Sequence, residues 1–164
     1  MAATRVLVRG RSLLRRKPVD RLMAELATRD YPAAAPVPRR MREQYDVVED
    51  EVDGCVVLRL TPRAGPSGEH LVYTHGGMYV YPLVAEHWWF LDRMARGSGV
   101  AVTVPLYRLA PEGGVDPAYE FLQKVYLDLV RSGPVTLAGD SSGAGLALGQ
   151  AVAYREAGLP TPVR

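Results

Sequence analysis

Cysteine, lysine and histidine are scarce in this 164-residue sequence, which contains one, two and three of them respectively. The single cysteine, Cys55, excludes an intramolecular disulfide and a zinc site built from cysteines. There is no run of 18 consecutive apolar residues and no apolar stretch of signal-peptide length at the N-terminus. The sequence therefore predicts no stable membrane anchor and favours a cytoplasmic protein.

Basic residues are concentrated at the start of the chain. Residues 1–45 carry 11 Lys or Arg against 4 Asp or Glu, although the whole chain has a net charge of only +2. Such a segment could contact nucleic acid or an anionic membrane. No aromatic residue lies among these arginines before Tyr31, so we interpret the segment as a solvated helix face and predict no nucleic-acid partner.

Two regions differ in their sequence pattern. Residues 18–28 have apolar side chains at helical spacing, and residues 31–38 contain three prolines, which predicts an amphipathic helix followed by an extended connector. We therefore divide the chain into an N-terminal helical arm with its Pro-rich connector, residues 1–40, and an α/β domain, residues 41–164.

Strands and helices alternate through the second region. A hairpin with its turn at Asp53-Gly54 opens the domain. An Asp116 N-cap is expected to begin the helix that ends before Gly133. The predicted strands are 45–52, 55–60, 70–74, 100–104 and 135–138, and the other predicted helices are 84–97 and 144–156. This alternation predicts an α/β fold with a mostly parallel sheet.

The segment at 139–143 has the pattern Gly-x-Ser-x-Gly, with Ser141 between a predicted strand and a predicted helix. This setting is typical of a nucleophile elbow, in which small neighbours allow a serine to occupy a strained turn with its hydroxyl exposed. The free N–H groups at the start of the helix point to where an oxyanion would form, so the Ser142 N–H is a candidate donor.

A second glycine-rich strand end occurs at His75-Gly76-Gly77-Met78. The carboxyl ends of parallel strands lie at one rim of the sheet, so this segment and the serine turn are expected to meet there. The first segment would supply backbone donors and the second would supply a nucleophile.

Three motifs occur in an order that resembles the hormone-sensitive lipase-like branch of the α/β-hydrolases. They are H-G-G-M-Y at 75–79, Y-R-L-A-P-E at 107–112 and G-D-S-S-G-A-G at 139–145. The resemblance runs from about residue 45 to the end of the chain. It implies an α/β-hydrolase fold, truncated after the elbow helix, and hydrolysis of a small carboxylic ester through an acyl-serine intermediate without a cofactor or metal.

The resemblance also implies roles for individual residues. Ser141 matches the nucleophile, and the oxyanion hole would comprise the N–H groups of Gly77, Met78 and Ser142, with Gly76 shaping the turn. His75 and Asp140 match residues that support the loop and the elbow. Met78 stands where the family usually has a third glycine, and residues 1–40 resemble a segment that helps to cap the substrate pocket.

The base and the acid of the triad cannot be assigned to residues of this chain. In the family both follow the serine, each after a later strand, and this sequence ends at Arg164. We interpret His70 and His87 as surface or packing residues and His75 as a residue that orders the oxyanion loop. His75 or Asp140 could act as a substitute base only if its side chain lay within hydrogen-bonding distance of the serine hydroxyl.

Several alternatives remain open at this point. An amidase or deacetylase acting on small N-acyl compounds would use the same residues, a non-catalytic ligand-binding homologue would keep the fold, and a degraded or truncated reading frame would have no function of its own. The predicted strand at 135–138 would form an open sheet edge, which predicts self-association or a complementing polypeptide.

Overall fold

The computed structural model describes residues 32–163 together with five residues nearer the N-terminus, Asp20, Arg21, Ala24, Glu25 and Thr28. The chain divides into two compact units, residues 1–30 and residues 31–164, and the fold below is that of the second. Most of the helix predicted at 18–28 lies outside the described residues; Asp20, Arg21, Ala24 and Glu25 are helical. None of the described helices is long and apolar enough to cross a membrane.

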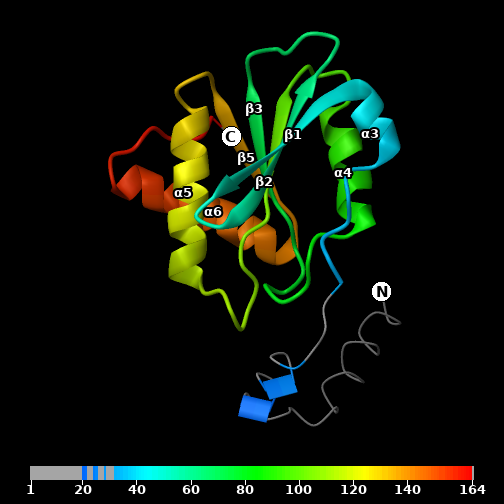
Figure 1. Cartoon of the computed structure of the whole chain (residues 1–164). Coiled ribbons are helices and arrows are strands. Elements are labelled where there is room, and N and C mark those ends of the chain that lie inside the picture. Colours follow the sequence, from blue (N-terminus) through cyan, green and yellow to red (C-terminus); the bar gives the residue numbers. More distant parts are fainter. Residues whose placement is uncertain (1–19, 22–23, 26–27, 29–31, 164) are drawn as a thin grey trace, which may run out of the picture. The chain divides into compact units, whose positions relative to one another are not determined.

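The second unit contains a five-stranded sheet in the order β1-β2-β4-β3-β5 (Figure 1). The strands are β1 (Tyr45–Val52), β2 (Cys55–Pro62), β3 (His70–Thr74), β4 (Ala101–Pro105) and β5 (Val135–Gly139). The predicted fold class is confirmed. The sheet is mixed rather than mostly parallel, because β2 pairs antiparallel with both β1 and β4, whereas β3 pairs parallel with β4 and β5.

The β1–β2 hairpin turns at the predicted dipeptide. Asp53 and Gly54 both have positive φ, 52° and 71°, the combination that a tight two-residue hairpin turn requires. Along β3 the four residues that follow His70 are all buried, as expected for a strand with neighbours on both edges and helices on both faces.

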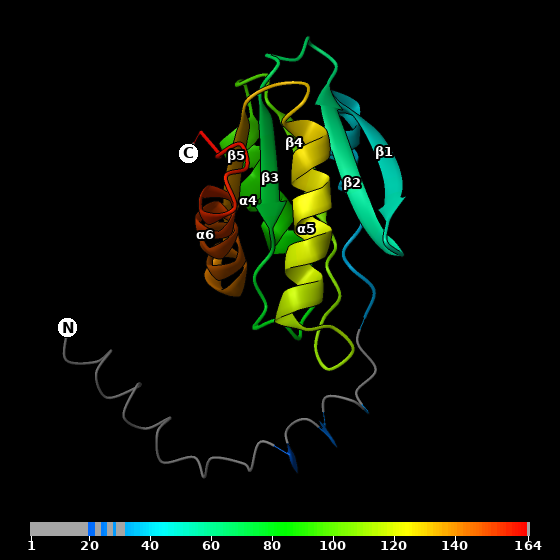
Figure 2. The ribbon, with the colours of Figure 1, turned by 90° about the vertical axis from the view of Figure 1, so that its left-hand side faces the viewer.

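Helices cover both faces of the sheet. Figure 2 shows α5 (Val115–Leu129) and α6 (Ser141–Glu156) on one face and α4 (Ala85–Ala95) on the other, with the short helix α3 (Arg39–Gln44). Each face has its own apolar core. Trp88, Leu91 and Tyr73 lie in the core beneath α4, and Phe121, Leu122 and Tyr154 lie in the core beneath α5 and α6.

Two helices begin earlier than predicted. The N-cap of α5 is Gly114, not Asp116, and no side chain caps the helix. Pro117 is therefore the third residue of α5, where its missing N–H costs nothing because the first N–H groups of a helix have no internal partner. Helix α6 begins at Ser141 and not at Ala144, because its first turn is formed by the serine and glycine of the elbow.

The Pro-rich connector packs on the α/β unit. Residues 32–38 form neither helix nor strand. The Ala35 N–H donates to the Leu83 carbonyl at 2.8 Å, and the Trp88 indole donates to the Ala35 carbonyl at 2.8 Å. Val37 and Met41 are buried in the core beneath α4. The connector therefore belongs to the second compact unit.

Strand β5 is the last strand of the sheet, next to β3. Its first residue, Val135, accepts a hydrogen bond from the Val163 N–H at 3.0 Å. No other strand among the described residues pairs with β5 on that side. The strand that carries the serine turn is therefore an edge strand.

Candidate active site

The turn between β5 and α6 places Ser141 at the carboxyl end of the sheet. Ser141 is exposed, is the first residue of α6 and has a φ of 48°, a conformation that non-glycine residues rarely adopt. Strain of this kind persists only when the surrounding structure imposes it, and it is concentrated at functional sites.

Close packing against β3 imposes this turn. A Cβ atom at Gly143 would lie 2.0 Å from the Thr74 carbonyl oxygen, and one at Gly139 would lie 2.6 Å from that same oxygen. The Thr74 hydroxyl in turn donates to the Gly143 carbonyl at 2.7 Å. The two glycines of Gly-x-Ser-x-Gly therefore allow α6 to begin directly against the end of β3.

The loop that follows β3 is also strained. Gly77, Met78 and Tyr79 have φ values of 123°, 58° and 64°, and the Val80 and Tyr81 N–H groups close the loop onto the Gly77 carbonyl at 3.0 and 2.9 Å. Met78 is 70% exposed. Met78, which stands where the family usually has a third glycine, thus adopts the left-handed conformation that a glycine would adopt without strain.

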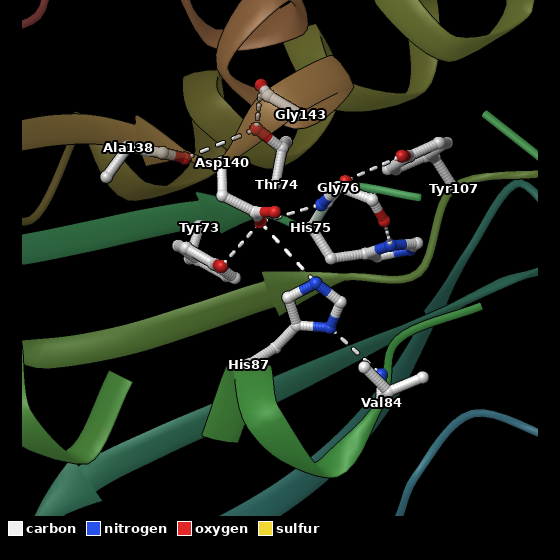
Figure 3. A network of polar contacts seen from close by, with 10 residues as sticks. All are labelled: Tyr73, Thr74, His75, Gly76, Val84, His87, Tyr107, Ala138, Asp140 and Gly143. Carbon is white, nitrogen blue, oxygen red and sulfur yellow. Dashed lines mark hydrogen bonds and ion pairs between the residues drawn. The ribbon is translucent and has the colours of Figure 1, made fainter. Parts of the chain in front are cut away.

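Asp140 connects the two strand ends (Figure 3). Its Oδ1 accepts hydrogen bonds from the Tyr73 hydroxyl and the Gly76 N–H, both at 2.7 Å, and lies 3.5 Å from Nε2 of His87. Burial opposes ionisation of Asp140, but these hydrogen bonds and the neighbouring His87 outweigh it and hold the pKa below its ordinary value. Asp140 is thus a carboxylate that joins the serine turn to the Gly76 loop.

His75 is enclosed beneath this loop and is only 2% exposed. Its ring stacks on Tyr107 with centroids 4.7 Å apart, and its Nδ1 lies 2.7 Å from the Gly76 carbonyl, which can only accept a hydrogen bond. The proton is therefore on Nδ1. Burial lowers the pKa of His75, so the ring is neutral at pH 7.

No imidazole is placed to activate Ser141, although the described residues include all three histidines of the chain. His70 pairs with the Ser132 hydroxyl at 3.0 Å near the amino end of β3, and His87 accepts from the Val84 N–H at 2.9 Å. Asp140 is engaged with Tyr73 and Gly76. Within the described part of the chain no group of three or more His, Cys, Asp or Glu could hold a metal ion.

The structure brings all the candidate site residues to one rim. Each belongs to one of two segments, 75–78 or 140–142, and Asp140 bridges the segments. Tyr73, Thr74 and His87 also join this network and were missed by the sequence reasoning. A signal was available for Tyr73 alone, because a tyrosine in a buried strand needs a partner for its hydroxyl.

We expect Asp140→Ala to lower the free energy of unfolding at pH 7 by about 1–2 kcal/mol, because the Tyr73 hydroxyl and the Gly76 N–H lose their acceptor. The side chain is 39% exposed, so solvent screening keeps the effect modest. Because folding lowers the pKa of Asp140, its contribution is present above the unfolded pKa of about 3.9 and is lost as the pH falls through the folded value.

Urea unfolding at pH 7 and at pH 3 measures this contribution. The difference between the natural chain and Asp140→Ala should shrink at the lower pH. Asp140→Asn keeps an acceptor oxygen and should lose less stability than Asp140→Ala at pH 7. Equal stability of all three proteins at pH 7 would contradict the bridging role.

Comparison with known proteins identifies relatives for most of this unit. Residues 71–164 match a protein family that has the alpha/beta hydrolase fold. A triacylglycerol lipase of Mycobacterium tuberculosis is 37% identical over 114 residues, which are 67% of this chain and 26% of that protein. An acetyl-hydrolase of Streptomyces hygroscopicus is 38% identical over 115 residues, which are 68% of this chain and 38% of that protein.

Solved structures agree with these relatives. An esterase from the bacterial hormone-sensitive lipase family superposes with a TM-score of 0.65 and 28% identity over 94% of this chain and 52% of that one. An esterase/lipase from an uncultured bacterium gives the same TM-score and identity over 92% of this chain and 50% of that one. The chain spans about half the length of these two structures, and it spans a smaller share of the length of the lipase and the acetyl-hydrolase.

Proposed function

Because this chain belongs to the hormone-sensitive lipase-like family of alpha/beta hydrolases, we propose that Ser141 is the nucleophile of a carboxylic-ester hydrolase. The observation that carries the proposal is the strained, exposed position of Ser141 at the first residue of α6, next to Asp140, which binds the Gly76 loop. The substrate would be a small acyl ester, and the reaction needs no cofactor.

The proposed reaction begins when Ser141 Oγ attacks the ester carbonyl carbon. The carbonyl oxygen becomes an oxyanion, for which the N–H groups of Gly77, Met78 and Ser142 are the proposed donors. Ser142 is the second residue of α6, so its N–H has no partner within the helix and the positive end of the helix dipole supports the developing charge. Each such donor is typically worth about 10²- to 10³-fold in rate.

The proton of Ser141 needs an acceptor outside the three histidines of this chain. Each of them is held by another partner: Ser132, Gly76, or Val84 and Asp140. We therefore propose that the base, and the acid that orients it, come from further polypeptide, either in a longer protein or in a second chain. Loss of triad members typically costs about 10⁴- to 10⁶-fold in turnover, so residues 1–164 alone should be nearly inactive.

Hydrolysis of a short-chain p-nitrophenyl ester by the purified chain, alongside Ser141→Ala, tests the proposal. We expect a slow release of nitrophenol that requires Ser141 and an acyl group on Ser141 detectable by mass spectrometry. Equal release by both proteins, with no acylated peptide containing residue 141, would contradict the nucleophile assignment. A parallel p-nitroanilide separates an esterase from an amidase or deacetylase, which would use the same residues of this rim.

A non-catalytic ligand-binding protein is the second candidate. The observation that favours it is the absence of an imidazole beside Ser141 in the described chain. A protein of this kind should bind acyl esters equally well with Ser141 or Ala at this position, and no acyl-enzyme should form even when the chain is extended by a complementing polypeptide.

We further propose that another polypeptide pairs with the outer edge of β5. The Pro134 carbonyl accepts a hydrogen bond from the backbone N–H of His70 in β3, whereas the Val135 carbonyl accepts one from the backbone N–H of Val163. Backbone groups of alternate residues therefore point to opposite edges of β5, and those of Leu137 point to the outer edge, as those of Val135 do. Light scattering should therefore detect dimers or larger species. Leu137→Pro removes an outward N–H and should shift the protein towards the monomer; a natural chain that stays monomeric at high concentration would contradict this.

A further inference from the structure

The loop that carries two of the proposed oxyanion donors is held by a tyrosine from a different strand end. Tyr107 lies two residues after β4 and is 4% exposed. Its hydroxyl donates to the His75 carbonyl at 2.7 Å (Figure 3). Burial raises the pKa of Tyr107, so this hydroxyl stays protonated and remains a donor at any physiological pH.

The first peptide unit of the loop is fixed at both of its ends. The His75 carbonyl accepts from Tyr107, and the N–H of the same unit, which belongs to Gly76, donates to Asp140 Oδ1 at 2.7 Å. A trans peptide unit is planar and its C=O and N–H point in opposite directions, so partners on both sides prevent it from rotating. Tyr107 and Asp140 therefore hold one peptide unit from two separate strand ends.

The second peptide unit is fixed through the His75 ring. Nδ1 of His75 lies 2.7 Å from the Gly76 carbonyl, and the ring stacks on Tyr107 at an interplanar angle of 15°. Because the Gly76 carbonyl points towards this ring, the Gly77 N–H at the other end of the unit points away from it. Tyr107 thus supports both peptide units that precede the Gly77 N–H, one through its hydroxyl and the other through its ring.

The fold itself does not use the Gly77 N–H. Within the described part of the chain neither this group nor the Met78 N–H donates a hydrogen bond. A backbone N–H whose direction is fixed but which has no partner in the protein is available to a ligand atom. A preorganised donor of this kind stabilises an oxyanion well because it need not reorient during the reaction.

We propose that Tyr107 is a positioning residue for the oxyanion hole, because it fixes the direction in which the Gly77 N–H points. This inference rests on the proposed function of Ser141. Tyr107 acts on the reaction through the loop. Without its hydroxyl the Gly77 N–H would still be present but would be free to turn, and the transition state would lose part of its stabilisation.

The test uses Ser141→Cys, because a thiolate attacks an ester without a general base. Acylation by p-nitrophenyl acetate places a negative charge on the carbonyl oxygen, whereas alkylation by iodoacetamide displaces iodide and forms no oxyanion. Mass spectrometry assigns both products to residue 141. The ratio of the two rates therefore measures oxyanion stabilisation separately from the reactivity of the thiol.

Tyr107→Phe in this background keeps the ring and removes the hydroxyl. It should lower the acylation rate about 10-fold, a part of the roughly 10²- to 10³-fold that a whole donor contributes, and leave the alkylation rate unchanged. Tyr126→Phe is the matched control, because the Tyr126 hydroxyl also donates to a carbonyl, that of Pro160 at 2.8 Å, and its ring also stacks, on Tyr154. These partners belong to neither segment of the rim, so this variant should change neither rate.

His75→Phe tests the same loop if Tyr107→Phe does not fold. A phenyl ring can stack on Tyr107 but cannot donate to the Gly76 carbonyl, so the acylation rate should again fall while the alkylation rate does not. Circular dichroism shows which variants are folded.

The inference would be overturned if folded Tyr107→Phe, or His75→Phe in its place, had the same ratio of acylation to alkylation as Tyr126→Phe. A ratio for Ser141→Cys no higher than that of N-acetylcysteine would overturn the proposed function instead. In that case the ¹H–¹⁵N shifts of Gly76 and Gly77 still test the role of Tyr107. They should change in Tyr107→Phe and not in Tyr126→Phe, and unchanged shifts would show that Tyr107 does not orient the loop.

Discussion

Gly143→Ala is expected to lower the free energy of unfolding by about 3–5 kcal/mol, a large part of the roughly 5–15 kcal/mol that stabilises a typical domain. The added methyl would lie 2.0 Å from the Thr74 carbonyl oxygen and 2.5 Å from that of His75. Both are backbone atoms at the end of β3, so no rotamer change relieves the contact. Helix α6 would have to move away from β3, which breaks the bond from the Thr74 hydroxyl to the Gly143 carbonyl.

Gly145→Ala is the matched control, two residues further along the same helix. There the nearest atom is the Tyr79 hydroxyl at 3.1 Å, which can move, and alanine favours the helix by about 1 kcal/mol relative to glycine. Thermal and urea unfolding followed by circular dichroism compares the two. Similar stabilities for the two variants would contradict the close packing of the elbow against β3.

Ser141→Cys is expected to be acylated by a p-nitrophenyl ester on the order of 100-fold faster than the natural chain at pH 8. A thiol with an ordinary pKa of about 8.5 ionises appreciably at this pH, and the N-terminus of a helix lowers that pKa further. A thiolate attacks without a general base, which the serine lacks here. The C–S bond forms as the bond to p-nitrophenolate breaks, so one equivalent of nitrophenol should appear as a burst.

Stopped-flow absorbance and mass spectrometry measure the burst and locate the thioester. Ser142→Cys is the control, because the Ser142 hydroxyl oxygen is buried and its thiol should react slowly. The natural Cys55 is 7% exposed and should stay unmodified in both proteins. A burst of equal rate in the natural chain would show that a base already acts on Ser141 and would refute the proposed absence of one.

Hydrophobic periodicity predicted the strands and the longer helices because each element has one buried face or is a continuous buried run. The short helix α3 was missed, since six residues are too few for a helical pattern to emerge, and its burial depends on Met41 reaching a core formed by residues far along the chain. The early start of α6 was missed because serine and glycine are poor helix formers, and only packing against β3 places them in a helix.

The site was predictable where it depends on local sequence and on the rule that parallel strands end at one rim. Ser141 has the expected strained turn, and the Gly76 loop meets it through Asp140. The partners Tyr73 and His87 could not be predicted from spacing, because each reaches Asp140 from a separate element more than 50 residues away. Such pairings are set by the order of strands in the sheet.

The strand order also decides when the apolar strand β3 is protected during synthesis. The β1–β2 hairpin can form as soon as its residues leave the ribosome, but β3 pairs with residues 101–103 and 135–139, which are made much later. At about 5–20 residues per second, β3 waits roughly 3–12 seconds for its second neighbour. During that interval the edge of β3 that finally pairs with β5 has no strand neighbour, so this half of the sheet can be completed only after residues 135–139 are made.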